Sequence, residues 1–426
     1  MATKQLLQGV DSLADRLGLL RRPLSNKELL KVAQRRTGLC DFGELPIVEP
    51  LQILLEACAK QASLSLVGRV ATRWDVIRFL TNLLTLREQE YRVPAILEQP
   101  IDKPVIITGL PRSGTTFLHR LMMEDPANRA PLVWETIYPY PLKQARDRRV
   151  ERVARQLRAF EWLAPEFRDL HPLHAHSPQE CSEITAHVFR SLRFDTTYHI
   201  PSYRAWLEED EQGHLSAYRF HKRFLQHLQY QHSGHSGPPR WVLKCPDHLF
   251  ALDAIRQVYP DARVILVHRD PVKVLLSVAK LTEVLRQPFT RRINRVEIGQ
   301  QESARWLEGT RRMMATADMA GLPEPICHVH YLDLVSDPVG TVTSVYRHFG
   351  LGLPAGAAQA MKRRVASEPG GGYGPRAYEF QDHGLEADAE REKFRPYTLR
   401  FGVSLEPLPI ARPRRRTPAI EAPALG

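Results

Sequence analysis

The pattern of apolar and polar positions divides the chain into a helical region and a region where strands and helices alternate. Residues 1–98 carry apolar side chains at helical spacing, and Ser25-Asn26-Lys27-Glu28 is a capping-box pattern that predicts a helix start. Short apolar runs predict buried strands at residues 105–107, 241–243, 264–267 and 326–329. We therefore predict a three-layer α/β fold with a mostly parallel central sheet, plus an N-terminal helical region.

Proline and arginine positions mark three segments. Pro100 discourages a helix from continuing, so we place a boundary between a helical region at residues 1–98 and an α/β domain at residues 99–405. Residues 406–426 contain a cluster of arginines and are predicted to form a basic, flexible tail.

Three sequences combine a capping residue with a following proline. Asp270-Pro271 and Asp337-Pro338 place proline at the first helical position after an aspartate cap, and each predicts a helix start. Ser177-Pro178, with Glu180 at the third helical position, fits the same pattern. We expect a helix to begin at each of the three.

Composition and charge narrow the function classes. No apolar run approaches the roughly 20 residues that span a bilayer, and the N-terminus becomes charged too early for a secretory signal, so we expect neither signal peptide nor membrane anchor. Five widely spaced cysteines indicate neither a disulfide framework nor a metal site, which favours a reducing, cytoplasmic location. The net charge of +11 favours an anionic partner, such as a polyphosphorylated cofactor, nucleic acid or an acidic membrane surface.

Residues 104–118 have the arrangement that holds a phosphate group. An apolar run is followed by a turn from Gly109 to Gly114, and Thr115 then opens an amphipathic helical pattern. Glycines allow a tight turn whose N–H groups point inward, and a helix N-terminus adds its positive end. Nucleoside triphosphatases have lysine at the position of Thr115, whereas this chain carries its positive charge on Arg112.

A second candidate phosphate contact follows the strand at residues 264–267. Arg269 leaves this strand, and Ser277 lies about two helical turns after the predicted cap Asp270. The two side chains therefore face the same side, where a guanidinium fork and a hydroxyl can clamp a phosphate. Because ligands of parallel sheets sit at the carboxyl ends of strands, we expect Arg112 and Arg269 to open onto one cleft.

The sequence Pro-Arg-Ser-Gly-Thr-Thr at residues 111–116 resembles the phosphosulfate loop of sulfotransferases that use 3′-phosphoadenosine-5′-phosphosulfate (PAPS). Its arginine makes it similar to the tyrosylprotein sulfotransferases and to many bacterial sulfotransferases. The resemblance extends over about residues 100–405 and implies a P-loop-like fold with PAPS as co-substrate. It assigns cofactor binding to Arg112, Ser113, Gly114, Thr115, Thr116, Arg269, Ser277, Tyr331 and Arg376.

Within this resemblance the later motifs have separate tasks. Arg269 and Ser277 correspond to the site of the cofactor's 3′-phosphate, and Tyr331, in a Tyr-x-Asp-Leu sequence, packs near the adenine. The glycine-rich loop at residues 370–376 ends in Arg376; it would either close over the 3′ side of the nucleotide or serve as a linker, and both interpretations stay open. Residues 394–402 also resemble the closing segment of bacterial sulfotransferases.

In-line transfer of a sulfonate needs a base, donors that hold the group, and positive charge at the leaving phosphate. The resemblance assigns the last two tasks to Arg112 and to Lys244, which lies in a Lys-x-Pro sequence. Glu135 matches the glutamate base of the tyrosylprotein enzymes. His248 is the other candidate, although the cytosolic enzymes place their base two residues after the lysine, where this chain has Pro246. Histidine has the more suitable intrinsic pKa, so both candidates stay open.

A metal site is a further option for the segment that follows the charged helical pattern of residues 142–170. His171, His174, His176 and Cys181 lie close together, but their spacing matches no familiar zinc pattern. We therefore expect this segment to line the acceptor pocket, and we expect transfer without a metal.

Two other functions compete with sulfonate transfer. A small-molecule kinase or NTPase would need a loop lysine and an acidic metal holder, which the motifs do not provide. A non-catalytic basic binding protein is supported by net charge alone. For a sulfotransferase we expect a hydroxyl or amine acceptor on a small molecule, glycan or lipid, and no nucleic acid. Peripheral contact with a membrane and the oligomeric state stay open.

Overall fold

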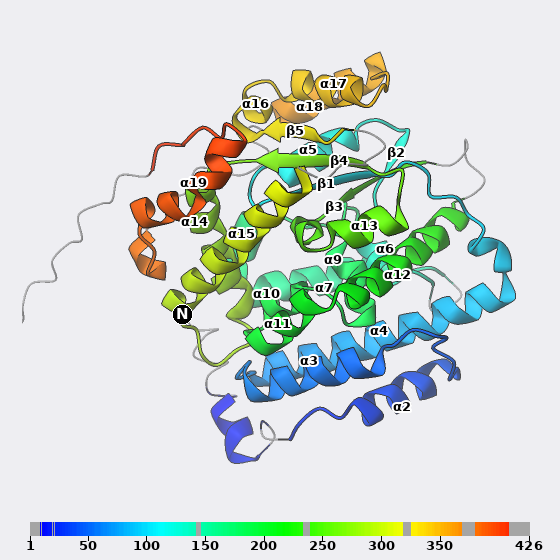
Figure 1. The fold of residues 1–426 in the computed structure, drawn as a ribbon. Helices are drawn as coiled ribbons and strands as arrows, with labels where there is room; N and C mark the ends of the chain where they lie inside the picture. The colour runs from blue at the N-terminus through cyan, green and yellow to red at the C-terminus, as the bar shows by residue number, and fades with distance from the viewer. Residues whose placement is uncertain are drawn as a thin grey trace, which may run out of the picture.

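A parallel sheet forms the centre of the molecule (Figure 1). The computed structural model describes residues 9, 11–18, 20, 22–141, 146–232, 239–317, 325–368 and 380–408. Within these residues the sheet has five strands in the order β2-β3-β1-β4-β5, and all neighbours are parallel. The strands are β1 (Val105–Gly109), β2 (Asn128–Arg129), β3 (Arg240–Lys244), β4 (Arg263–His268) and β5 (Cys327–His330). The four predicted strands are confirmed, and the short edge strand β2 is an addition.

Side chains of the sheet alternate between two hydrophobic cores. Val105 and Ile107 of β1 point into one core, and Ile106 points into a larger core on the opposite face. Because both faces are covered, the strands are apolar along their length, as is typical of parallel sheets. The smaller core is covered by α5 (Thr115–Met122), α16 (Tyr331–Ser336), α17 (Pro338–His348) and α18 (Ala355–Ser367).

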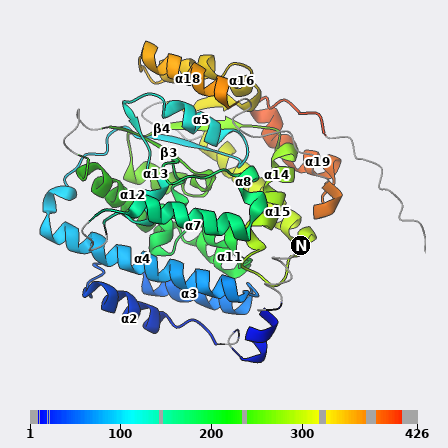
Figure 2. The same cartoon turned by 180° about the vertical axis from the view of Figure 1, so that it is seen from behind.

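Most of the remaining helices lie on the side of the larger core. The long ones are α7 (Arg149–Leu163), α12 (Glu211–Tyr230), α14 (Pro271–Arg286), α15 (Arg295–Ala317) and α19 (Ala387–Arg400). The shorter ones are η1 (Pro94–Ile96), α6 (Val133–Ile137), α8 (Pro165–Leu170), α9 (Ser182–Thr185), η2 (Ala186–Val188), α10 (Arg193–Thr197), α11 (Pro201–Glu209), η3 (Pro246–Phe250), α13 (Leu252–Val258) and η5 (Phe380–His383). Figure 2 shows α7 between the strands and the N-terminal helices. This arrangement is the predicted three-layer, P-loop-like α/β fold.

The N-terminal region packs against the same core as the sheet. It consists of α2 (Asn26–Thr37), α3 (Val48–Lys60) and α4 (Leu66–Arg92). Ser25 Oγ accepts the N–H of Glu28 at 3.4 Å, as the capping-box pattern predicts. Leu29 and Phe79 of this region share the larger core with Ile106 of the sheet. Within the described chain, no helix combines the length and apolar character needed to cross a bilayer.

Two of the three predicted helix starts are confirmed. Asp270 caps α14 by accepting the N–H of Val272, and Asp337 caps α17 through Gly340 N–H, both at 2.9 Å. The predicted start at Ser177 is wrong, because the next helix begins only at Ser182. The intervening backbone pairs instead with the chain just before α6, through bonds such as that from Gln179 N–H to the carbonyl of Pro131 at 2.8 Å.

Candidate active site

The loop between β1 and α5 is built around two glycines. Gly109 has φ +148°, and a Cβ there would lie 2.3 Å from the carbonyl oxygen of Val267 on β4. Gly114 has φ +92°, and a Cβ there would lie 3.0 Å from the ring of Tyr331. Ser113 is fully buried and donates to the carbonyl of Leu110 at 2.6 Å, which fixes the turn. The loop can therefore approach its neighbours more closely than side chains would allow.

Arg112 and the second predicted phosphate site lie together. Arg112 Nε donates to Ser277 Oγ at 3.0 Å, and Arg269 Nη1 donates to the backbone carbonyl of Arg112 at 2.6 Å. Arg112, Arg269 and Ser277 all line one cavity. The expectation that both arginines open onto one cleft is confirmed.

Tyr331 completes this end of the cavity. It is the first residue of α16, and its ring lies flat against Arg269, with the guanidinium carbon 3.7 Å from the ring centroid. The ring also lies close to Gly114, where a Cβ would come within 3.0 Å of it. Arg376 lies outside the described residues, so the predicted closure by residues 370–376 stays a prediction.

Lys244 ends β3 beneath the same loop and is 2% exposed. Its Nζ donates to Thr116 Oγ1 at 3.1 Å and to Glu180 Oε1 at 2.5 Å. Thr116 and Glu180 both line the cavity. The ammonium thus joins the phosphate-binding loop to a carboxylate that faces the cavity.

The two predicted bases do not line the cavity. Glu135 is 2% exposed, and its carboxylate accepts hydrogen bonds from Arg129 and from the N–H of Leu132, both at 2.9 Å. Glu135 therefore caps α6 and forms an ion pair with Arg129. His248 is fully buried against Tyr218 Oη, and burial lowers its pKa well below the ordinary value. Neither residue is among those that line the cavity, and the expectation that one of them accepts the acceptor's proton stays a prediction.

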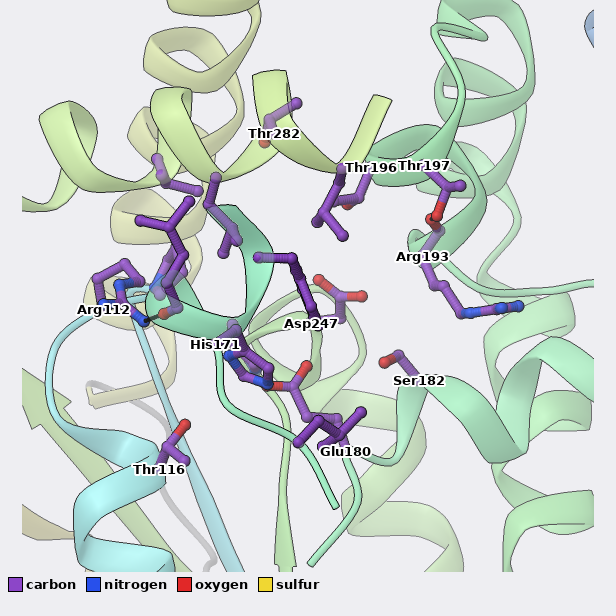
Figure 3. A pocket seen from close by; sticks show the side chains of 18 of the residues that line it. Arg112, Thr116, His171, Glu180, Ser182, Arg193, Thr196, Thr197, Asp247 and Thr282 are labelled. Carbon is purple, nitrogen blue, oxygen red and sulfur yellow. Dashed lines mark hydrogen bonds between the residues drawn. The ribbon is translucent and has the colours of Figure 1, made fainter. Parts of the chain in front are cut away.

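Three other titratable groups face the cavity between the loop and α10 (Figure 3). Burial acts to raise the pKa of Glu180, but the charge and hydrogen bond of Lys244, together with His171 and His119, outweigh it, and the pKa lies below its ordinary value. Burial lowers the pKa of His171 to about 4, so its imidazole is neutral at neutral pH. Burial also raises the pKa of Asp247 to about 6, although Arg305, at 2.9 Å, opposes the shift. Glu180 lies in the segment that the sequence predicted to line the acceptor pocket, but the sequence patterns gave it no chemical role, and they did not indicate Asp247 at all.

The cavity has a volume of about 880 Å³ and continues well beyond the phosphate-binding loop. Its middle wall is mostly apolar and comes from α7, α8, α14 and the segment after α14. The wall includes Leu157, Phe160, Phe167, Leu281, Leu285 and Phe289. Of the predicted acceptor-lining segment, His171 does reach the cavity, and α4 and α10 contribute a further wall.

Figure 3 shows Arg193 across the cavity from Arg112. Arg193 belongs to a ring of four charged side chains, all of which line the cavity. Arg78 Nη2 donates to Asp75 at 2.7 Å and to Glu183 at 2.6 Å. Arg193 contacts the same two carboxylates at 2.7 and 3.0 Å. The ring is electrically balanced, since two cations face two anions.

In the part of the chain that the structure describes, no group of three or more His, Cys, Asp or Glu side chains is placed to hold a metal ion.

The sequence of this chain matches a known protein family and individual members of it. The model of the sulfotransferase family matches residues 104–355, which is more than half of the chain. The omega-hydroxy-beta-dihydromenaquinone-9 sulfotransferases Stf3 of Mycobacterium bovis and Mycobacterium tuberculosis are 26% identical over 275 residues. The match covers 59% of this chain and 63% of those proteins, so the chain spans less than two thirds of their length.

Two solved structures resemble this protein over nearly the whole fold. Sulfotransferase STF1 from Mycobacterium tuberculosis is 30% identical, with a TM-score of 0.74 over 88% of this chain and 99% of that one. Sulfotransferase STF9 from Mycobacterium avium is 26% identical, with a TM-score of 0.80 over 90% and 98%. Together with the match of the family model, these likenesses show that the chain belongs to the sulfotransferase family.

Proposed function

We propose that this protein transfers a sulfonate group from PAPS to a hydroxyl group of a largely apolar acceptor, without a metal. The observation that carries the proposal is the meeting of Arg112, Ser277, Arg269 and Thr116 around one end of a cavity whose remaining wall is mostly apolar, with buried Lys244 in contact with Thr116. Membership of the sulfotransferase family supports the reaction type and disfavours both a kinase and a non-catalytic binder.

The polar end of the cavity suits the two anionic groups of the nucleotide. The loop from Gly109 to Gly114 and the start of α5 offer backbone N–H groups to the 5′-phosphosulfate, with Thr115 and Thr116 beside them. Arg269 and Ser277 would hold the 3′-phosphate, and Tyr331 would pack near the adenine. Arginine forks recognise phosphate oxygens through paired hydrogen bonds, which supports this assignment.

Glu180 is our candidate for the base, in place of Glu135 and His248. Its carboxylate faces the cavity, and its contact with Lys244 joins it to the phosphate-binding loop. In the transfer, the acceptor oxygen forms a bond to sulfur, its proton passes to Glu180, and the bond from sulfur to the 5′-phosphate oxygen breaks with its electron pair. Protonation neutralises Glu180, so Lys244 can then stabilise the charge that develops on the leaving phosphate.

The neutral imidazole of His171 is the second candidate base. It lines the same part of the cavity, and its lowered pKa leaves it able to accept a proton at neutral pH. Glu180→Gln and His171→Ala separate the two, because the base variant loses turnover while keeping its affinity for adenosine 3′,5′-bisphosphate (PAP). Full turnover in both variants would remove both candidates.

The apolar wall favours an acceptor with a bulky hydrophobic part, and the Stf3 relatives, named for a menaquinone derivative, agree with that chemistry. Peripheral contact with a membrane would give such a substrate a route to the cavity. A reducing compartment such as the cytoplasm fits the chain, because all five cysteines are free thiols and four of them are buried.

The test of the proposal is binding followed by transfer. PAP at about a hundred times its Kd is expected to stabilise the protein by about 2.7 kcal/mol, seen as a rise in Tm of several degrees, whereas ATP with Mg²⁺ is expected to give a much smaller shift. PAPS labelled with sulfur-35 should then label primary alcohols that carry an apolar chain. Stabilisation by ATP with Mg²⁺ and not by PAP would refute the proposal.

A further inference from the structure

The chain after α19 runs along the carboxyl ends of β4 and β5. We call residues 401–408 the C-terminal segment. The ring of Phe401 stacks on His268 with centroids 4.5 Å apart, and Tyr397, one turn earlier, contacts His268 Nδ1 through its hydroxyl at 3.1 Å. Val403 is buried. The C-terminal segment is therefore anchored to the last residue of β4, next to Arg269.

One side chain of this segment reaches the predicted 3′-phosphate site. Glu406 accepts two hydrogen bonds from Arg269, from Nε to Oε1 at 2.7 Å and from Nη2 to Oε2 at 2.9 Å. Such a paired contact between a guanidinium and a carboxylate fixes orientation as well as charge. The Glu406 side chain is only 12% exposed, so solvent screens the pair weakly.

The backbone of Glu406 is fixed as well. Its N–H donates to Asp270 Oδ2 at 2.8 Å, while Asp270 Oδ1 caps α14. One carboxylate thus ties the C-terminal segment to the helix that carries Ser277. Asp270 is fully buried, so this link lies inside the protein and not on its surface.

Three contacts then determine how the guanidinium of Arg269 is oriented. Glu406 holds the edge formed by Nε and Nη2, the carbonyl of Arg112 accepts from Nη1, and the ring of Tyr331 lies against one face. Five N–H donors are available on an arginine. Among the described residues, these hydrogen bonds account for three of the five and leave one N–H on Nη1 and one on Nη2.

We propose that Glu406 is a positioning residue for cofactor recognition: it holds Arg269 so that its two remaining N–H groups face the cofactor's 3′-phosphate. The inference rests on the proposed function, because it needs a nucleotide with a 3′-phosphate at this end of the cavity. The C-terminal segment is then part of the cofactor site and not only a covering strand of chain. Glu406 acts through Arg269 and makes no contact with the nucleotide itself.

The experiment measures how much of the nucleotide's affinity depends on its 3′-phosphate. Isothermal titration of the full chain compares PAP with AMP, which lacks that phosphate. In Glu406→Gln we expect the Kd for PAP to rise about tenfold, as for loss of a charge-assisted contact, while the Kd for AMP changes less than about twofold. Glu406→Asp, which keeps the charge on a shorter side chain, should recover part of the loss.

A double-mutant cycle tests that the effect passes through Arg269. Lysine is a point charge without a fork, so Arg269→Lys should itself weaken PAP binding, and adding Glu406→Gln in that background should cost less than about threefold more. Glu124→Gln is the control, because Glu124 forms a partly buried pair with Arg364 away from the cavity. PAP binding by this control should equal that of the wild type.

The contrary outcomes are distinct. Equal losses for PAP and AMP in Glu406→Gln would mean that the residue only supports the fold, and tighter binding of PAP would mean that Glu406 competes with the phosphate. Either result overturns the inference. If the unmodified protein binds neither PAP nor PAPS, the proposed function itself fails, and the inference falls with it.

Discussion

Lys244 places a positive charge where the proposed reaction develops a negative one. It is buried, and its ammonium contacts Thr116 of the phosphate-binding loop and Glu180 of the cavity wall. A preorganised cation of this kind typically contributes about 10²–10³-fold to turnover. We expect Lys244→Met to lower kcat by that order with labelled PAPS, while Lys222→Met, whose ammonium lies over Tyr259, keeps it. Unchanged turnover in Lys244→Met would contradict the role.

Glu135 and Glu180 give opposite predictions. Glu135 caps α6, so Glu135→Gln should lower the free energy of unfolding by about 1 kcal/mol and leave kcat almost unchanged. Glu180→Gln should lower kcat strongly with a smaller effect on Tm. Urea unfolding and steady-state kinetics on both variants check this, and loss of turnover in Glu135→Gln without loss of stability would reverse the two assignments.

The residues that the sequence predicted well are those fixed by local geometry. Gly109, Gly114 and Arg112 belong to one short turn, and Arg269 and Ser277 belong to one strand-to-helix connection, so spacing alone places them. Glu180 depends on a contact with Lys244, which lies 64 positions away along the chain. The spacing of residues within a motif carries no information on such a contact. A carboxylate in a loop predicted to line the acceptor pocket was a weak indication that Glu180 could have a role.

At the scale of elements, close approach of β1 and β4 fixes the phosphate-binding loop. A Cβ at Gly109 would lie 2.3 Å from a backbone oxygen of β4, and that backbone cannot move without breaking the sheet. We expect Gly109→Ala to lower the free energy of unfolding by more than about 2 kcal/mol and to weaken PAP binding, as measured by chemical unfolding and calorimetry. Wild-type stability in this variant would show that the two strands can separate.

Helix α4 is joined to α12 through Glu90, which contacts Arg223 at 2.5 Å and His227 at 3.2 Å. Burial acts to raise the pKa of Glu90, but His227 and Arg223 outweigh it and lower the pKa to about 2. A lowered pKa in the folded state means that the ionised form stabilises the fold. This contribution is complete above the ordinary pKa of 4.5 and is lost as the pH falls toward 2.

We therefore expect Glu90→Gln to lower the free energy of unfolding by about 1–3 kcal/mol at pH 7, with a smaller difference from wild type at pH 3.5. Urea titrations at pH 7, 5 and 3.5 measure the trend. A difference that grows on acidification would contradict the assigned direction of the pKa.

Strand and helix order could be predicted because apolar runs and proline caps are local features. The helix predicted to start at Ser177 does not form there, because the backbone of this segment pairs with residues near Pro131 that are distant in sequence. Trp74, Asp75 and Arg78 of α4 also line the cavity, and only the tertiary structure shows which residues of the N-terminal helices do so.

At the scale of the whole molecule, the apolar wall of the cavity sets the expected substrate preference. Each buried methylene contributes about 0.8 kcal/mol, so kcat/KM for primary alcohols should rise about fourfold per added carbon until the cavity is filled. A series of straight-chain alcohols assayed with labelled PAPS tests this. No dependence on chain length would contradict an apolar acceptor site and favour a sugar-like one.

The balanced ring of Asp75, Arg78, Glu183 and Arg193 limits how this enzyme can change its preference. Removing one member leaves an ion without its counter-ion away from water, which costs several kcal/mol in buried settings. Exchange of one cation together with one anion preserves neutrality. Natural drift and laboratory evolution toward a new acceptor should therefore proceed at this end by coupled replacements, and related enzymes with different substrates should differ here in pairs.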